Sequence, residues 1–219
     1  MNSTLRQIAV LAAKDLRIES RTRHTLGLVL VLGILIISVL GFGFRKLDPE
    51  TAQKATPAIL WVAYLFSGVL CFEKTMATER QDGALAGLLL APIDRGVIYA
   101  GKLVSNLLLM FAVAAVITPV GIVFFQFDLA AQGVGFIGII AISMLGFAAI
   151  GTLFAGLMSS SRLQGGMLAM VIFPLVLPLV IASTKQVAEP GGSGLAILLA
   201  FDAIFLTASW IVFELVLEP

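Results

Sequence analysis

Charged residues are scarce in this sequence. Only 12% of its 219 residues are Asp, Glu, Lys or Arg, and 59% are apolar, whereas an ordinary soluble domain is about a quarter charged and about half apolar. Fourteen basic and thirteen acidic residues cannot cover the surface of a soluble domain of this length, so a water-soluble globule is excluded. Disorder is excluded too, because so apolar a chain with a net charge of +1 would not stay solvated.

The residues that build most metal and redox sites are almost absent. The single cysteine, Cys71, permits no internal disulfide or thiolate cluster, and the single histidine, His24, permits no His-rich metal site. The sequence contains no C-x-x-C or H-x-x-x-H pattern and no G-x-x-x-x-G-K-[ST] phosphate loop. It therefore predicts no metal site and no catalytic residues, and nothing in it points to nucleic acid.

Long apolar blocks are what the sequence does have. A helix needs roughly 20 apolar residues to cross a bilayer core about 30 Å thick with its backbone satisfied. We predict six spans, at residues 25–44, 57–72, 103–127, 133–158, 165–184 and 194–214. The second block is short, but Trp61 and Tyr64 suit a membrane boundary. The chain is therefore predicted to be an all-α integral membrane protein, a single transmembrane domain over residues 1–219.

The distribution of Lys and Arg predicts how the spans are oriented. Ten basic residues fall in the N-terminal arm, between spans two and three, and between spans four and five, whereas four fall on the opposite side. Because basic residues accumulate on the cytoplasmic side, both termini are predicted to be cytoplasmic, in a bacterial inner membrane.

Residues 1–24 show the pattern of an amphipathic helix. On a helical wheel one face is apolar and the opposite face is basic. The apolar face contains Leu5, Ile8, Ala9, Ala12 and Leu16, and the basic face contains Arg6, Lys14, Arg17 and Arg21. This pattern predicts a helix in the cytoplasmic interface, with its basic side toward lipid phosphates. The alternative is an ordinary basic flank that only sets topology.

The largest polar segment, residues 73–102, is too short for a catalytic domain. It carries eight of the 27 charges. We expect a mixed-charge turn from Glu79 to Asp82, then Gly83, a short amphipathic helix, and a stop at Pro92. This arrangement is typical of an element that docks on a cytoplasmic partner. The alternative is a short surface helix that merely connects two spans.

Two features inside the spans stand out. Pro174 and Pro178 lie one turn apart in the fifth span and are predicted to bend that helix. Asp202 lies in the sixth span, where a charge is costly, so we expect it to face protein or water. Helix packing or a boundary position is favoured over a transport role for Asp202.

The segment from Ala77 to Lys102 resembles the hallmark of ABC-2 exporter membrane subunits. In that class an acidic residue, a glycine, a Leu-rich helix and a proline form the element that contacts the ATPase. The matching positions in this sequence are Glu79, Gly83, Leu85 to Leu90 and Pro92.

The resemblance is sharper still to one family, haem exporter protein B, which is the B subunit of the cytochrome c maturation system. The matching residues are Trp61-Val62-Ala63, Glu73, Gln81-Asp82-Gly83, Leu85, Leu88, Leu90, Pro92 and Lys102, followed by Gly165-Gly166-Met167, Phe173-Pro174-Leu175 and Pro178-Leu179. Length, six spans and the amphipathic arm agree with the family along the whole chain.

The resemblance implies a non-enzymatic permease with an ABC-2 (type V exporter-like) fold. Its expected partners are a separate ATPase subunit, like haem exporter protein A, membrane subunits that handle haem, and a periplasmic haem chaperone. A permease homodimer is also implied. ATP hydrolysis would drive either haem export or release of the haem-loaded chaperone. The residues leave two alternatives open, an ABC-2 permease for a drug or lipid, and a non-transporting scaffold for haem-handling proteins.

Haem is expected to be a transported or chaperone-bound ligand rather than a resident cofactor of this chain. Axial ligands of haem are usually His, Met, Cys or Tyr. The only histidine, His24, is predicted to lie at the cytoplasmic edge of the first span, beside Arg23. The sequence therefore predicts no His-dependent haem site in this subunit.

Overall fold

The computed structural model of the chain describes residues 2–44, 48–81, 87, 93–159 and 166–216. Within these ranges the chain is helical and contains no strand. The helices are α1 (Asn2–Thr22), α2 (His24–Gly43), α3 (Pro49–Gln81), α5 (Arg95–Phe125), α6 (Leu129–Ser159), α7 (Met167–Ala188) and α8 (Gly194–Val216). Six of them, α2 to α8, are long and apolar enough to cross a membrane. The predicted class, an all-α multi-pass membrane protein, is confirmed.

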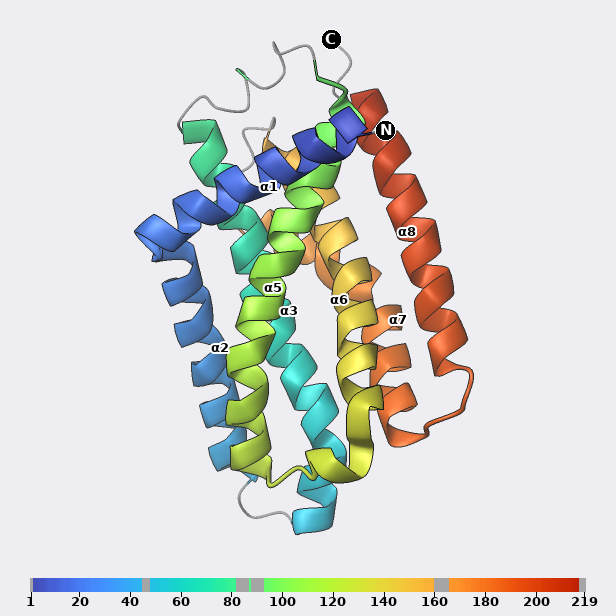
Figure 1. The fold of residues 1–219 in the computed structure, drawn as a ribbon. Helices are drawn as coiled ribbons and strands as arrows, with labels where there is room; N and C mark the ends of the chain where they lie inside the picture. Colours follow the sequence, from blue (N-terminus) through green and yellow to red (C-terminus); the bar gives the residue numbers. More distant parts are fainter. Residues whose placement is uncertain (1, 45–47, 82–86, 88–92, 160–165, 217–219) are drawn as a thin grey trace.

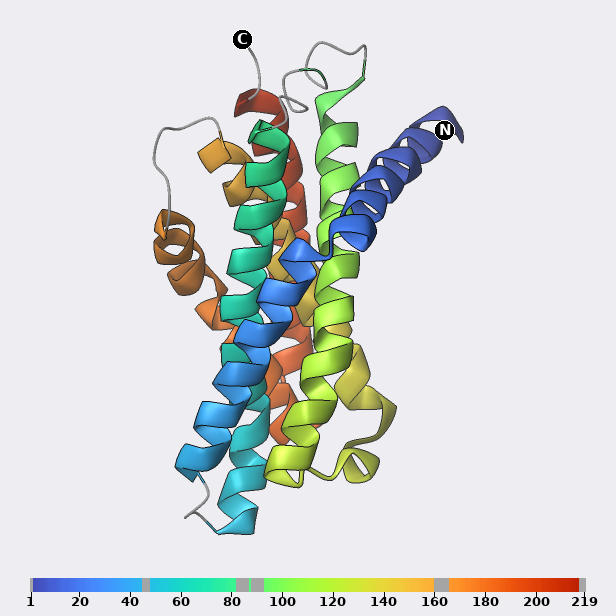
Figure 2. The same ribbon diagram turned by 90° about the vertical axis from the view of Figure 1, so that its left-hand side faces the viewer.

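Helices α2 to α8 form an elongated bundle, and α1 crosses one end of it at a steep angle to α2 (Figures 1 and 2). We call this the terminal end, because it carries α1, the last turn of α3, the first turn of α5 and the last turn of α8. The opposite end, called the far end, carries the start of α3 and the α5–α6 and α7–α8 connections (Figure 1).

Two helix starts are capped by acidic side chains. Asp94 precedes α5, and its Oδ1 accepts a hydrogen bond from the Gly96 amide at 3.0 Å. Asp48 precedes α3, and its Oδ2 accepts the Thr51 amide at 2.9 Å. Such bonds satisfy amides that have no partner within the helix. Hydrogen bonding from Thr51 lowers the pKa of the Asp48 carboxyl below its ordinary value.

The second membrane helix is much longer than its 16-residue apolar block. α3 has 33 residues, begins at Pro49 and includes Pro57. The sequence predicted a turn from Glu79 to Asp82. The start of this prediction is wrong, because Glu79 to Gln81 are helical and form the last turn of α3. The third helix also begins before its apolar block, at Arg95. Helices continue past the apolar blocks because polar residues such as Lys, Glu and Gln have good helix propensity.

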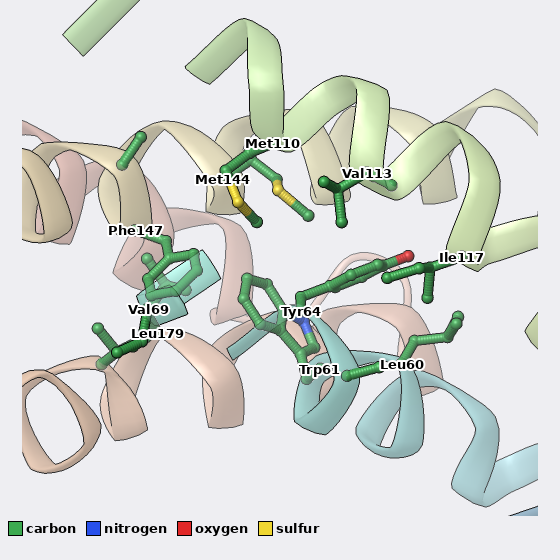
Figure 3. Packing of buried hydrophobic residues seen from close by; sticks show 14 of the residues in the cluster. Leu60, Trp61, Tyr64, Val69, Met110, Val113, Ile117, Met144, Phe147 and Leu179 are labelled. Carbon is green, nitrogen blue, oxygen red and sulfur yellow. The ribbon is translucent and has the colours of Figure 1, made fainter. Parts of the chain in front are cut away.

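The core is centred on α3 and contains the aromatic residues that sequence reasoning placed at a boundary. Trp61 and Tyr64 are 2% and 1% exposed, so both side chains pack inside the bundle and do not face lipid headgroups. Their rings contact edge to face at 5.7 Å, and Trp61 also contacts Phe147 at 6.4 Å. Met110 and Met144 fill the space above them (Figure 3).

The two buried aromatics also have polar partners. The Trp61 indole donates to Ser183 Oγ at 2.9 Å, and the Tyr64 hydroxyl bonds Thr118 Oγ1 at 2.6 Å. Buried Trp and Tyr usually find such partners, and here these partners fix α3 against α7 and α5.

Candidate functional site

The amphipathic helix α1 docks on α5 through an ion pair. Lys102 Nζ lies 2.7 Å from Asp15 Oδ2, and Ser105 Oγ donates to the same oxygen at 3.2 Å. The Lys102 side chain is 5% exposed and that of Asp15 is 14% exposed. Gly101 permits the close approach, because a Cβ at this position would lie 2.8 Å from Leu11 Cβ. Helix α1 therefore rests on protein along this face.

The face that α1 turns to the bundle differs in part from the predicted apolar face. Ala12 is buried and Leu16 packs on the core, as the wheel indicated, but Leu5 and Ala9 are exposed. Among the predicted basic residues, Arg6, Arg17 and Arg21 are exposed, whereas Lys14 is half-buried, with Nζ 3.2 Å from Asp15 Oδ1. Contact of α1 with a lipid interface stays a prediction.

A second acidic residue of α1, Glu19, fixes the corner between α1 and α2. It is 7% exposed, and its Oε1 accepts the Leu26 amide at 2.7 Å. The chain turns at Arg23, which has the left-handed conformation (φ 51) and donates its amide to the Glu19 carbonyl at 2.7 Å. Sequence reasoning missed both Asp15 and Glu19. Their signal was two acidic residues in an otherwise basic arm.

The structure describes both ends of the predicted coupling segment, residues 73–81 and 93–102, but little of its centre. Glu79 and Gln81 belong to the last turn of α3, and Asp94 caps the start of α5. The end of α3 and the start of α5 both lie at the terminal end of the bundle (Figure 1). The remaining residues assigned to coupling lie outside the described residues: Asp82, Gly83, Leu85, Leu88 and Pro92. Their coupling role stays a prediction.

A hydrogen-bonded chain of polar side chains links α3, α5 and α6 inside the bundle. Thr75 Oγ1 donates to Asn106 Oδ1 at 3.1 Å, and Asn106 Nδ2 donates to Thr152 Oγ1 at 2.9 Å. Asn106 and Thr152 are fully buried. Sequence reasoning missed this chain, and its signal is the amide side chain of Asn106 inside an apolar block.

A second polar contact joins α5, α6 and α8. Tyr99 OH donates to the Ala149 carbonyl at 3.2 Å, and Ser209 Oγ donates to the same carbonyl at 3.5 Å. Together, these bonds and the Asn106 chain tie the terminal half of α5 to its neighbours.

Glycines on α6 receive large side chains from α3 and α8. A Cβ at Gly151 would lie 2.1 Å from Phe72 of α3, and one at Gly156 would lie 2.7 Å from Phe213 of α8. At Gly146 the neighbour is Asp202 of α8, with Oδ1 2.1 Å from the position of such a Cβ. Asp202 is 5% exposed, and within the described ranges of the chain no hydrogen-bond partner lies at either carboxyl oxygen.

The remaining singled-out residues do not converge on a site. Pro174 and Pro178 lie inside α7, and the bend expected there stays a prediction. His24 is exposed at the start of α2, and Cys71 is fully buried in the core. In the part of the chain that the structure describes, no three His, Cys, Asp or Glu side chains gather as metal ligands would.

Six apolar helices with a docked amphipathic helix define a multi-pass integral membrane protein. Residues 6–217 match the family model described as CcmB protein, and the chain belongs to this family. It is 28% identical over 189 residues to Heme exporter protein B of Paracoccus denitrificans, covering 84% of this chain and 83% of the relative. It is 25% identical over 190 residues to Heme exporter protein B of Rhodobacter capsulatus, covering 85% and 84%. A 59-residue stretch, 27% of each chain, is 30% identical to Heme exporter protein B of Escherichia coli K12.

Proposed function

We propose that this chain is the membrane permease subunit of an ABC system that exports haem for cytochrome c biogenesis. The observation that carries the proposal is the match of nearly the whole chain to the CcmB family, with relatives named Heme exporter protein B. ATP would be hydrolysed on a separate ATPase subunit, since this sequence has no phosphate loop. ATP hydrolysis would drive either the export of haem itself or the release of the haem-loaded periplasmic chaperone.

In this proposal the terminal end of the bundle is cytoplasmic. Basic residues on that end include Arg6, Arg17, Arg21, Arg95 and Lys102, and the positive-inside rule favours this orientation. The ATPase would then contact residues 79–92, and the haem chaperone would meet the far end. A pair of permeases over two ATPases is the arrangement that the ABC-2 resemblance implies.

The contacts around α5 offer a physical route for coupling. α5 begins at the Asp94 cap, immediately after the proposed docking segment, and packs on α1, α2, α3, α6 and α8. A push on the segment would move α5 as a rigid body. The Lys102–Asp15 ion pair would carry α1 with it, and the Thr75–Asn106–Thr152 chain would carry α3 and α6.

The proposal is tested by pull-down from native membranes in mild detergent. We expect the unsubstituted chain to bring down an ATPase and haem-handling subunits. Glu79→Lys and Gly83→Trp should each weaken ATPase association and cytochrome c assembly while membrane insertion stays normal. Glu50→Lys is the matched control for ATPase association, since Glu50 is exposed at the opposite end of α3, and it should retain the ATPase.

Three results would overturn parts of the proposal. Retention of the ATPase and of full assembly by both variants would remove the coupling role of residues 79–92. An ATPase recovered without any haem-maturation partner would favour a drug or lipid permease. Normal assembly with a catalytically inactive ATPase would favour a scaffold.

Orientation has its own test. Ser20 of α1 and Ser193, just before α8, are both exposed. In intact cells an impermeant thiol reagent should label Ser193→Cys from outside but not Ser20→Cys. The native chain serves as the blank, because Cys71 is fully buried. The reverse pattern would discard the proposed orientation.

A further inference from the structure

One buried carboxyl group in the membrane-spanning part of the bundle differs from the other buried polar groups. Asp202 is 5% exposed, and among the residues that the structure describes neither of its oxygens has a hydrogen-bond partner. By contrast, the buried side chains of Lys102, Asn106 and Tyr99 each have a hydrogen-bond partner. Burying an ionised carboxylate without pairing or hydrogen bonds is very costly, and such groups neutralise instead. The state of Asp202 therefore needs its own explanation.

Asp202 lies near the middle of its span. It is 8 residues after Gly194 and 11 before Phe213, the two ends of the apolar part of α8. Its neighbour Gly146 is 11 residues after Gly135 and 12 before Met158, the ends of the apolar part of α6. At this depth the outside of the bundle is hydrocarbon rather than water.

The immediate surroundings of Asp202 are the backbone of α6 and apolar side chains. A Cβ built at Gly146 would lie 2.1 Å from Asp202 Oδ1, 2.8 Å from Leu179 Cδ1 and 3.2 Å from Phe201 Cδ1. The glycine thus lets the carboxyl lie directly on α6, with α7 closing the other side. Any separation of α8 from α6 would uncover the group.

No charge on the packed helices compensates Asp202. Helix α8 packs on α6, α7 and α5. The sequence of α6 contains no ionisable residue. The one ionisable residue of α7 is Lys185, which is exposed and is separated from Leu179 by about 9 Å of helix rise. On α5, Lys102 pairs with Asp15, Tyr99 donates to Ala149, and Arg95 begins the helix at the terminal end. On α8 itself the other ionisable residue is Glu214, about 18 Å of helix rise away.

We propose that Asp202 is a proton-binding site, which holds a proton while α8 packs on α6 at Gly146 and releases it when the two helices separate. On release, the carboxyl O–H bond breaks and the proton passes to water that enters between the helices. Proton release and helix separation are then linked equilibria, so raising the pH favours the separated arrangement. The inference does not depend on which cargo the complex moves.

Infrared spectroscopy of the full chain in lipid vesicles tests the bound proton. At neutral pH exposed carboxyls, with ordinary pKa values of about 4, are ionised. We expect a carbonyl band of a protonated carboxylic acid at neutral pH that is absent in Asp202→Asn. Absence of the band from the native chain, or its persistence in Asp202→Asn, would overturn the proposal.

Trp210 reports the linked movement. It is 40% exposed on α8 and packs against Gly96 of α5, whereas Trp61 is 2% exposed. Quenching by lipids with brominated acyl chains therefore acts mainly on Trp210. We expect quenching to change with pH as the carbonyl band disappears, and to show no such change in Asp202→Asn. Loss of the band without a change in quenching would overturn the linkage.

A second variant keeps the test valid if Asp202→Asn does not insert. In Gly146→Ala the added methyl group occupies the space of Asp202 Oδ1, so α8 should be displaced from α6. The infrared carbonyl band should then disappear at a lower pH than in the native chain. Gly138→Ala is the matched control on the same helix, because a Cβ there meets nothing within 4 Å. Equal behaviour of the two alanine variants would overturn the role of the α6 contact.

Discussion

Lys102 and Asp15, 87 residues apart in the sequence, meet with Nζ 2.7 Å from Oδ2. This ion pair places an acidic residue on the inner face of a helix whose outer face is basic. Amphipathicity alone would let α1 rotate or slide on the bundle surface, whereas a charge pair inside an apolar contact sets one register.

Breaking this pair should loosen α1. Asp15→Ala removes the carboxylate from beside a Lys102 side chain that is 5% exposed, and breaking a buried pair from one side costs about 3 kcal/mol or more. We expect a clearly lower thermal denaturation midpoint in mild detergent. The control is Lys54→Ala, which removes an exposed pair with Glu50 and should change little. Equal midpoints for the two variants would contradict the role of the pair.

The close approach at Gly101 predicts opposite effects for two glycine substitutions. Gly101→Ala should displace α1, because the added Cβ would lie 2.8 Å from Leu11 Cβ, and proteolysis within α1 should become faster. Gly27→Ala has open space around it and should stabilise α2 by about 1 kcal/mol through helix propensity. Unchanged protection of α1 in Gly101→Ala would show that the helices are not in close contact.

Asn106 is expected to matter for packing of three helices at once. Asn106→Ala removes both hydrogen bonds of the chain to Thr75 and Thr152, and bonds of this kind between membrane helices are worth about 1 kcal/mol each. We therefore expect a loss of about 2 kcal/mol in unfolding experiments in detergent. Ser38→Ala is the comparison, because the hydrogen bond from Ser38 Oγ to the Ile34 carbonyl lies within one helix, and this variant should be neutral.

The Asp48 cap predicts a local acid response at the far end. Hydrogen bonding from Thr51 lowers the pKa of Asp48 in the folded chain. Its stabilising effect is thus present above the unfolded value of about 3.9 and is lost as pH falls through the lower folded value. Hydrogen exchange at Thr51 and Ala52, corrected for intrinsic rates, should quicken on acidification. Asp48→Asn, which can still cap, should abolish this pH dependence.

His24 is predicted to be dispensable for haem delivery. It is exposed at the first residue of α2, and in the proposed function partner subunits handle haem. His24→Ala should leave cytochrome c assembly near normal, and the purified chain should show no stoichiometric Soret absorbance. A one-to-one haem complex that is lost in His24→Ala would make direct ligation by this subunit the better account.

The six apolar helices were predictable because bilayer thickness dictates the length and composition of a span. The residues at which the helices end were less predictable. The sequence marks where α3 leaves the apolar region after Phe72 but not that the helix continues to Gln81, because propensity, rather than hydropathy, decides where a polar helix stops.

The inner contacts were beyond sequence reasoning for a different reason. Whether Trp61 faces a headgroup or the core, and whether Asp15 faces water or Lys102, depends on which helices become neighbours. Periodicity identifies the faces of one helix without naming the partner for each face. Asp202 was recognisable as costly from its position alone, but its contact with Gly146 required the packed helices.

Docking of α1 has a consequence for how the protein is made. Helix α1 is received by Gly101, Lys102 and Ser105, which lie in the third membrane helix. Because α1 is synthesised before this helix, it cannot dock until the later segment has emerged from the ribosome. The Glu19 bond to Leu26 and the Arg23 corner need only residues 19–26, so they can set the direction of α1 early. The ion pair with Lys102 then closes only after α5 is in the membrane, which makes it a late step of biogenesis.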